Sequence, residues 1–227
     1  MGMFQSWEDF RQAVVDARPL YIRSAGSEED RRSLEAAFSE ERVRVAFNVY
    51  KAAQWAVEIQ NMGLIAGNRL DQDEVIATEK IPGIDSEVIK NFKTMSETTE
   101  RGTGQVLDSS KWTILVNDAW LLGGAHYIAQ FFLASPRTRE NLHRTVRPDW
   151  FKKSRKFRTG FTVFSRELIG LKSCGYEFES HQTTGEIAYL PQGADHPGSL
   201  TFSTYQERVN HYTEDNRWLS LVDPTRG

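Results

Sequence analysis

The sequence has little of what several specialised protein classes require. Only one of its 227 residues is a cysteine, Cys174, so the chain can form no internal disulfide and no multi-cysteine metal site such as a zinc finger. The N-terminus lacks the basic stretch and apolar run of a secretory signal, and no segment approaches the roughly 18 apolar residues of a membrane span. We therefore expect a soluble, cytoplasmic protein that does not bind a membrane.

Motifs that mark several large enzyme classes are also missing. The chain has no GxxxxGK[ST] phosphate loop, no HExxH, no GxSxG and no CxxC. The run Gly102, Thr103, Gly104 lacks the remainder of a dinucleotide-binding fingerprint. The sequence therefore indicates no particular cofactor, and the cofactor stays unknown. It also matches no metal-binding motif.

Composition is that of an ordinary folded domain. Hydrophobic residues make up 39%, aromatic residues 11% and charged residues 26% of the chain, which is far from the composition of disordered proteins. The length fits one domain with a substantial core. No repeat or linker-like stretch divides it, so we expect a single domain over residues 1–227.

The first hundred residues show mainly helical patterns. Ser6 heads an apolar pattern with helical spacing that ends at Pro19, and Leu20–Arg23 has the composition of a short strand. Ser27 heads a second helical pattern, and residues 41–62, free of glycine and proline, predict a largely buried helix. Two further helices are expected over residues 71–80 and 86–100.

From residue 105 onward strand patterns become frequent. Residues 112–116 and 131–133 are short apolar runs typical of strands, and residues 119–122 fit a strand better than a helix begun at Asn117. Residues 176–179 and 186–189 alternate as a hairpin around Thr184 and Gly185. Helices are expected from Thr162 or Ser165 to Gly175 and from Ser203. The predicted class is α+β: a mainly helical N-terminal half packed on a small mixed or antiparallel sheet from the C-terminal half.

One stretch departs from the mildly acidic character of the chain, and we call residues 137–158 the basic segment. It holds nine Lys or Arg and two acids, a local charge of +7, so the rest of the chain carries −10 of the total of −3. Aromatic residues, Trp150, Phe151 and Phe157, lie among the cations. The candidate binding residues are Arg137, Arg139, Arg144, Arg147, Trp150, Lys152, Lys153, Arg155, Lys156 and Arg158.

Three interpretations of the basic segment stay open. Cations with interleaved aromatic rings suit a surface that neutralises phosphates and stacks bases, as in nucleic-acid binding. The same cations suit an acidic face of a protein partner. The plainest alternative is a solvated loop whose cations pair with the chain's own acids.

A candidate catalytic set precedes and follows the basic segment. Asp118, His126 and Glu167 combine an imidazole with two carboxylates, which can perform acid–base chemistry or bind one divalent metal ion. Their spacing matches no known motif. The alternative is that Asp118 forms a turn and His126 is a buried, hydrogen-bonded residue. Cys174 lies at the end of an apolar pattern, which favours a small buried side chain over a nucleophile.

Two functional hypotheses follow from these patterns. The first is a non-catalytic interaction module of bacterial type that recognises an acidic or phosphate-bearing partner, nucleic acid included, through the basic segment. The second is an enzyme acting on a phosphate-bearing substrate, a nuclease or nucleotide transferase of toxin-like character, using Asp118, His126 and Glu167. The sequence leaves the oligomeric state open.

Overall fold

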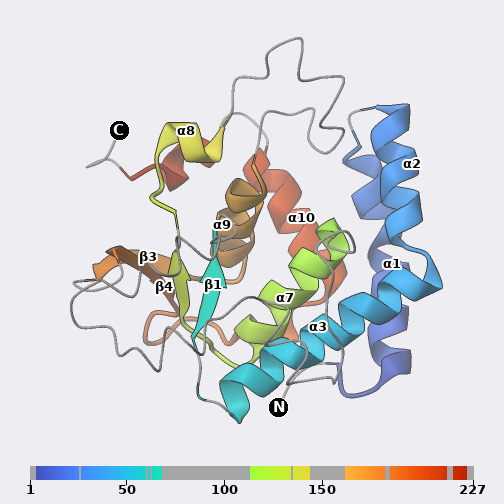
Figure 1. The fold of residues 1–227 in the computed structure, drawn as a ribbon, viewed down its shortest axis with the longest axis horizontal. Coiled ribbons are helices and arrows are strands. Elements are labelled where there is room, and N and C mark those ends of the chain that lie inside the picture. Colours follow the sequence, from blue (N-terminus) through green and yellow to red (C-terminus); the bar gives the residue numbers. More distant parts are fainter. Residues whose placement is uncertain are drawn as a thin grey trace, which may run out of the picture.

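The computed structural model describes residues 4–25, 27–59, 61, 63–67, 113–133, 135–143, 162–181, 185–213 and 217–223. Helices lie on one side of a small sheet (Figure 1). In chain order the elements are α1 (Trp7–Arg23), α2 (Glu28–Ala37), α3 (Glu40–Glu58), β1 (Leu64–Ala66), α7 (Ile114–His126), β2 (Phe131–Leu133), α8 (Arg139–Leu142), α9 (Val163–Ser173), β3 (Glu177–His181), β4 (Gly185–Tyr189), the 3-10 helix η3 (Pro197–Ser199), α10 (Phe202–Thr213) and the 3-10 helix η4 (Arg217–Leu221). The predicted α+β class is confirmed.

The sheet has four strands in the order β1, β2, β4, β3. β2 pairs with β4 in antiparallel fashion, Phe131 opposite Ala188, and β3 and β4 form the predicted antiparallel hairpin. β1 adds a parallel edge strand, with Leu64 opposite Phe131. The sheet is therefore mixed, and three of its strands come from the second half of the chain as expected.

Capping residues define the starts of several helices. The hydroxyl of Ser6 accepts a hydrogen bond from the backbone of Asp9 at 3.0 Å, and Ser27 accepts one from Asp30 at 3.1 Å. Thr162 does the same for α9, accepting from Ser165. The predicted starts at Ser6, Ser27 and Thr162 are confirmed, because each side chain satisfies a backbone donor that the first helical turn leaves unpaired.

The strand predicted at Leu20–Arg23 is wrong, because α1 continues through Pro19 to Arg23. Tyr21 follows Ala17 by four residues and Val14 by seven, so its burial extends the apolar stripe of the helix. Pro19 is exposed. Tertiary packing of Tyr21 thus outweighs the local cost of proline inside a helix.

The strands predicted at residues 112–116 and 119–122 are also wrong where the structure describes them, because residues 114–126 form α7. Twelve of the residues in α7, from Leu115 to His126, are buried. A helix buried on every side has no polar face, so its sequence shows no helical period and resembles a buried strand. Thr113 caps it, in place of Asn117.

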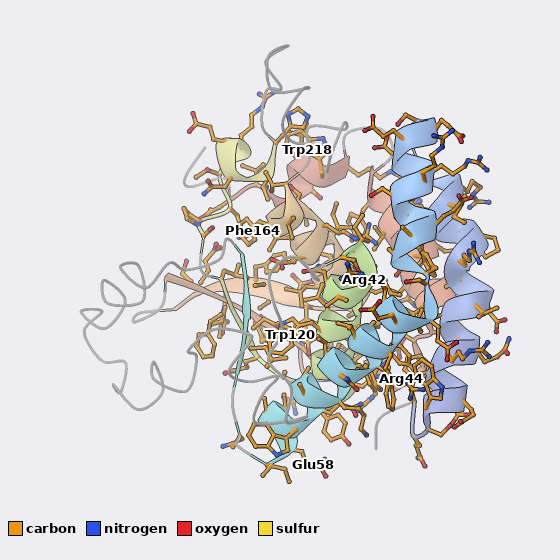
Figure 2. The ribbon with its side chains drawn as sticks, turned by 45° about the vertical axis from the view of Figure 1, so that its right-hand side comes forward. Arg42, Arg44, Glu58, Trp120, Phe164 and Trp218 are labelled. Atoms are coloured by element: carbon orange, nitrogen blue, oxygen red, sulfur yellow. The ribbon has the colours of Figure 1, made fainter. Side chains whose placement is uncertain are left out.

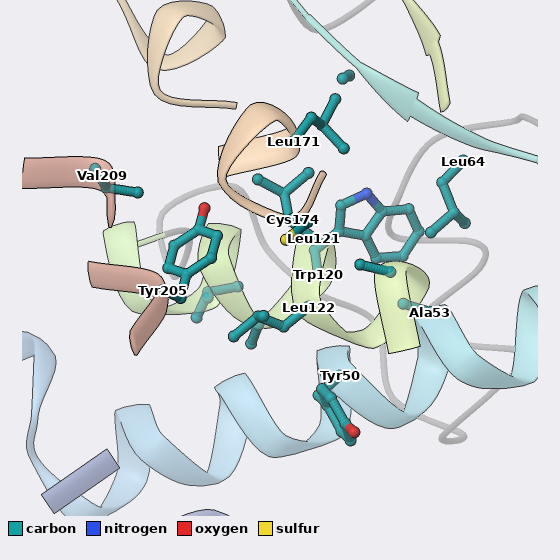
Figure 3. Packing of buried hydrophobic residues seen from close by; sticks show 14 of the residues in the cluster. Tyr50, Ala53, Leu64, Trp120, Leu121, Leu122, Leu171, Cys174, Tyr205 and Val209 are labelled. Carbon is teal, nitrogen blue, oxygen red and sulfur yellow. The ribbon is translucent and has the colours of Figure 1, made fainter. Parts of the chain in front are cut away.

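Close packing of α7 against α3 requires Gly123. A side chain at Gly123 would lie 2.6 Å from the backbone oxygen of Tyr50. In Figure 3, Leu121 of α7 lies between α3, which contributes Tyr50, and α9, which contributes Leu171. The centre of the core is therefore α7 itself, with helices packed around it.

The remaining helix predictions have mixed outcomes. The buried helix expected at residues 41–62 is α3, and those expected near residues 165 and 203 are α9 and α10. The helices expected at 71–80 and 86–100 lie outside the described residues.

On the outer side of the helical part, Arg44 of α3 lies over the ring of Trp7 at 3.6 Å (Figure 2). Within the described ranges no helix is both long and apolar enough to cross a membrane.

We expect Gly123→Ala to destabilise the fold by about 1 to 3 kcal/mol, because the added methyl group meets rigid backbone of α3. Urea unfolding followed by circular dichroism measures the change. Ser33→Ala on the exposed face of α2 is the control and should change stability by less than about 0.5 kcal/mol. Equal stability of G123A and the wild type would contradict the close approach of the two helices.

Candidate functional site

Asp118 is the most fully enclosed charge in the described structure. It is 0% exposed, and its carboxylate accepts two hydrogen bonds from Arg166, from Nε at 3.0 Å and from Nη2 at 2.6 Å. The hydroxyls of Tyr21 and Tyr205 also donate to it, at 2.5 and 3.3 Å. Arg166 Nη2 additionally donates to Gln206 at 2.8 Å. The carboxylate is therefore surrounded by donors from three other helices.

Electrostatics in this network favour an ionised pair. Burial alone would lower the pKa of Arg166, but the charge and hydrogen bonds of Asp118 outweigh burial and raise it. Burial and then the charge of Asp118 raise the pKa of Tyr21 well above its ordinary value, so Tyr21 stays protonated as a donor. Asp118 is thus occupied by internal partners, which is the geometry of a structural ion pair.

His126 lies at the opposite end of α7 and has different partners. Its Nε2 donates to the carbonyl of Leu200 at 3.1 Å, and its Nδ1 accepts from the hydroxyl of Tyr50 at 2.7 Å. Burial lowers the pKa of His126 to about 4. The imidazole is therefore neutral near pH 7 with both nitrogens in use, and it has neither a free base nor a free acid to offer a substrate.

Glu167 differs from these two groups because its environment keeps a proton on it. The residue is 6% exposed and accepts a hydrogen bond from the backbone N–H of Gly67 at 2.6 Å. Burial raises its pKa to about 8, more than the Gly67 hydrogen bond lowers it. The hydrogen bond from Gly67 links Glu167 of α9 to the residue that follows β1.

The structure does not gather Asp118, His126 and Glu167 around one point. Asp118 and His126 are eight residues apart on one helix, about 12 Å along its axis, and their partners differ. Cys174 is buried, and burial raises the pKa of its thiol to about 12. No group of three His, Cys, Asp or Glu side chains within the described ranges is placed to hold a metal ion. Chemistry by this set therefore has no geometric support.

The first residue of the basic segment faces inward. Arg137 donates to Glu186 from Nε at 2.9 Å and from Nη2 at 2.7 Å, and from Nη1 to the carbonyl of Leu221 at 2.8 Å. Its side chain is 11% exposed, and that of Glu186 is 3% exposed. Arg137 thus connects the hairpin with η4, and each of its three guanidinium nitrogens makes a hydrogen bond inside the fold.

Residues on either side of the central basic segment are anchored to each other. The backbone N–H of Thr162 donates to the carbonyl of Leu142 at 3.2 Å, and the Thr162 hydroxyl donates to that of Asn141 at 2.6 Å. The Ser165 hydroxyl also donates to Leu142. Leu142 is completely buried. The residues that flank 144–161 on its two sides are therefore held side by side.

A half-buried histidine, a buried tryptophan and one exposed cation lie together at this place. The ring of His143 stacks on Trp218 at 5.2 Å, and Arg139 is exposed beside it in α8. The other candidate binding residues lie outside the described residues: Arg144, Arg147, Trp150, Lys152, Lys153, Arg155, Lys156 and Arg158.

Sequence patterns missed the partners of the buried carboxylate. Tyr21 lies in the stretch predicted as a strand, and no sequence pattern singles out Arg166. One available signal was the charge of Asp118 inside an apolar run, since a buried charge requires a partner of opposite charge. No signal in the sequence indicates which of the 28 Lys and Arg residues that partner is.

Comparison with known proteins adds no further assignment. No protein-family model matches the chain, no curated protein is significantly similar to it, and no solved structure matches its fold at a significant level. The function has to be argued from the residues of this chain.

We expect Asp118→Asn to cost about 3 kcal/mol or more of stability, because it leaves the Arg166 charge buried without a counter-charge. The double variant D118N/R166Q should regain part of that loss, since it removes both charges. Chemical unfolding measures both. As a control, Glu177→Gln breaks the exposed ion pair with Lys172 and should cost less than about 1 kcal/mol. Equal costs for the buried and the exposed pair would contradict the structural role of Asp118.

Glu167→Gln should change how stability depends on pH. The pKa of Glu167 is about 8 in the folded protein and near 4.5 when unfolded, so the folded state keeps a proton that the unfolded state loses between these values, and wild-type stability falls as pH rises. Gln cannot titrate. The stability of E167Q relative to the wild type should therefore rise by about 1 kcal/mol or more between pH 5 and 8.

Urea unfolding at pH 5, 6, 7 and 8 tests the expected behaviour of Glu167. Glu41→Gln, at an exposed position of α3, is the control and should show no such trend. A constant difference between E167Q and the wild type across this range would show that Glu167 is ionised in the fold.

Proposed function

We propose that this protein is a non-catalytic, cytoplasmic interaction module that recognises an acidic or phosphate-bearing partner through the basic segment. The observation that carries the proposal is the division of charge: +7 on residues 137–158 and −10 on all other residues. A partner of negative charge is attracted by the first part and repelled by the second, which directs it to one region of the molecule.

The contacts that hold the described residues on both sides of 144–161 also support the proposal. Arg137 and Leu142 are held inside the fold, and Thr162 closes the segment at its other end. Between these anchors, residues 144–161 contain seven Lys or Arg and one acid, a net charge of +6. The residues that flank this stretch are therefore fixed at one place on the fold.

Nucleic acid is the partner that the composition favours within this class. Trp150, Phe151 and Phe157 lie among the cations, and aromatic rings stack on bases while Lys and Arg neutralise phosphates. An acidic protein face uses the charges but has less need of three rings. Single-stranded nucleic acid exposes its bases, so it is the form that such a segment fits best.

The enzyme alternative receives no comparable support. Asp118 and His126 are occupied by internal hydrogen bonds at separate places, and Glu167 is held by Gly67. A general acid or base has to reach the proton that it transfers. None of the three groups shares a partner with Arg139, the exposed cation of the described part of the basic segment.

Reversing four charges tests the proposal. In K152E/K153E/R155E/K156E the basic segment becomes acidic, so binding of a labelled single-stranded oligonucleotide, measured by fluorescence anisotropy, should weaken by at least about tenfold. The dependence of log affinity on log salt should also become flatter, because each lost phosphate contact removes about 0.7 from the slope. A labelled polyglutamate peptide is the parallel probe for an acidic protein face.

The control variant carries the same change of charge elsewhere. R11E/R18E/R23E/K51E replaces four exposed cations of α1 and α3 and should bind like the wild type. Loss of polyglutamate binding alone would assign an acidic protein partner. If both probes bind the segment variant as they bind the wild type, or bind neither protein, the proposal is wrong.

A further inference from the structure

A small cavity lies between the end of α9 and the outer face of α10, which run side by side (Figure 1). Its volume is about 360 Å³, within the range of sites for small ligands. The lining residues are Lys172, Ser173, Gly175, Glu207, Arg208, His211 and Tyr212. None of them belongs to the basic segment or to the network around Asp118.

Two basic residues, Lys172 and Arg208, and one acid, Glu207, line the cavity. Lys172 is already paired with Glu177 at 2.9 Å, so Arg208 is the residue of the lining that is placed to bind an anion. Arg217 of η4 contacts the ring of His211 and brings a further cation to the rim.

Arg208 has donors to spare. Its Nη1 donates to the carbonyl of Ser173 at 2.6 Å, which satisfies the end of α9. Across the described residues, no hydrogen bond is made by its Nε or Nη2. Two N–H groups of a guanidinium that is already fixed at one nitrogen can bind a carboxylate or phosphate in a defined geometry.

The rest of the wall is suited to a flat apolar group. Tyr212 is half-buried, and its ring meets the ring of His211 edge to face at a centroid distance of 6.4 Å. Gly175, which has a positive φ of 90°, lines the cavity with backbone alone because it has no side chain. A ligand bound to Arg208 by an anionic group would therefore have its ring beside aromatic side chains.

We propose that the cavity between α9 and α10 binds a small aromatic anion, a phosphate or carboxylate attached to a flat ring, with Arg208 holding the anionic group and Tyr212 the ring. Such a site is independent of the proposed function, because it uses residues outside the basic segment.

NMR titration of the full chain with phenyl phosphate tests the site. We expect saturable shifts of the backbone signals of Arg208, His211 and Tyr212. Inorganic phosphate, which lacks the ring, and phenol, which lacks the charge, should each bind several-fold more weakly. A concentration of about 10 mM phenyl phosphate is far above the dissociation constant expected of a specific site. Absence of saturable shifts at these residues up to that concentration would overturn the proposal.

Two variants change the affinity in opposite directions. Arg208→Gln should weaken phenyl phosphate binding by about tenfold, because it removes a charge-assisted pair of hydrogen bonds. Glu207→Gln at an exposed position should strengthen it by about threefold, because it removes the one negative charge of the lining. E207Q keeps the proposal testable even if R208Q disturbs the end of α9, and Glu41→Gln is its control.

The variant K152E/K153E/R155E/K156E separates the two proposals. It should bind phenyl phosphate like the wild type while losing the oligonucleotide. If this variant loses phenyl phosphate, or if E207Q binds it no more tightly than E41Q, the cavity is not the site. Failure of both the oligonucleotide and polyglutamate to bind the wild type would overturn the proposed function and leave the cavity unaffected.

Discussion

The burial of one carboxylate organises the helical part of this protein. Asp118 lies on α7, which is enclosed by other elements, and a charge in such a position is tolerated only with an opposite charge and a full set of donors. Arg166 supplies the charge from α9, while Tyr21 and Tyr205 supply hydroxyls from α1 and α10. Four helices far apart in sequence therefore have to meet in one arrangement. Apolar packing alone would allow several, so we infer that this network contributes to the uniqueness of the fold.

The same requirement explains where the sequence was informative. Caps such as Ser6, Ser27 and Thr162 are local, because their hydrogen bonds reach only three residues ahead, and their effect is visible in the sequence. The hairpin has a period of two and a short turn, which is also local. In contrast, α7 has no polar face, and the continuation of α1 past Pro19 depends on Tyr21 reaching a residue 97 positions away. Tertiary contacts decided these elements, and no window of sequence contains them.

The roles of the candidate site residues also depend on tertiary contacts that the sequence does not show. The alternative in which His126 is a buried, hydrogen-bonded residue agrees with the structure, whereas Asp118 lies inside α7 and forms no turn. Residue type alone could not separate a catalytic group from a structural one. That distinction depends on whether lone pairs and protons are left over after the internal bonds are counted. For Asp118 and His126 the count leaves none that a substrate can reach. For Arg208, counted over the described part of the chain, it leaves two donor nitrogens beside a cavity, at a residue whose surroundings in the sequence carry no recognisable motif.

Arg137 shows why a local charge does not by itself define a binding surface. It is the first cation of the basic segment, yet all three of its guanidinium nitrogens are bound to Glu186 and Leu221 inside the fold. An ion pair exposed to water would contribute little, but this one is largely buried, so separating its partners would leave a charge without compensation. The pair therefore resists opening, and with Leu142 and Thr162 it keeps the ends of residues 144–161 in place. In the proposed module the cations consequently have two separate tasks: Arg137 holds the segment against the acidic body, and the residues beyond His143 carry the net positive charge that attracts a partner.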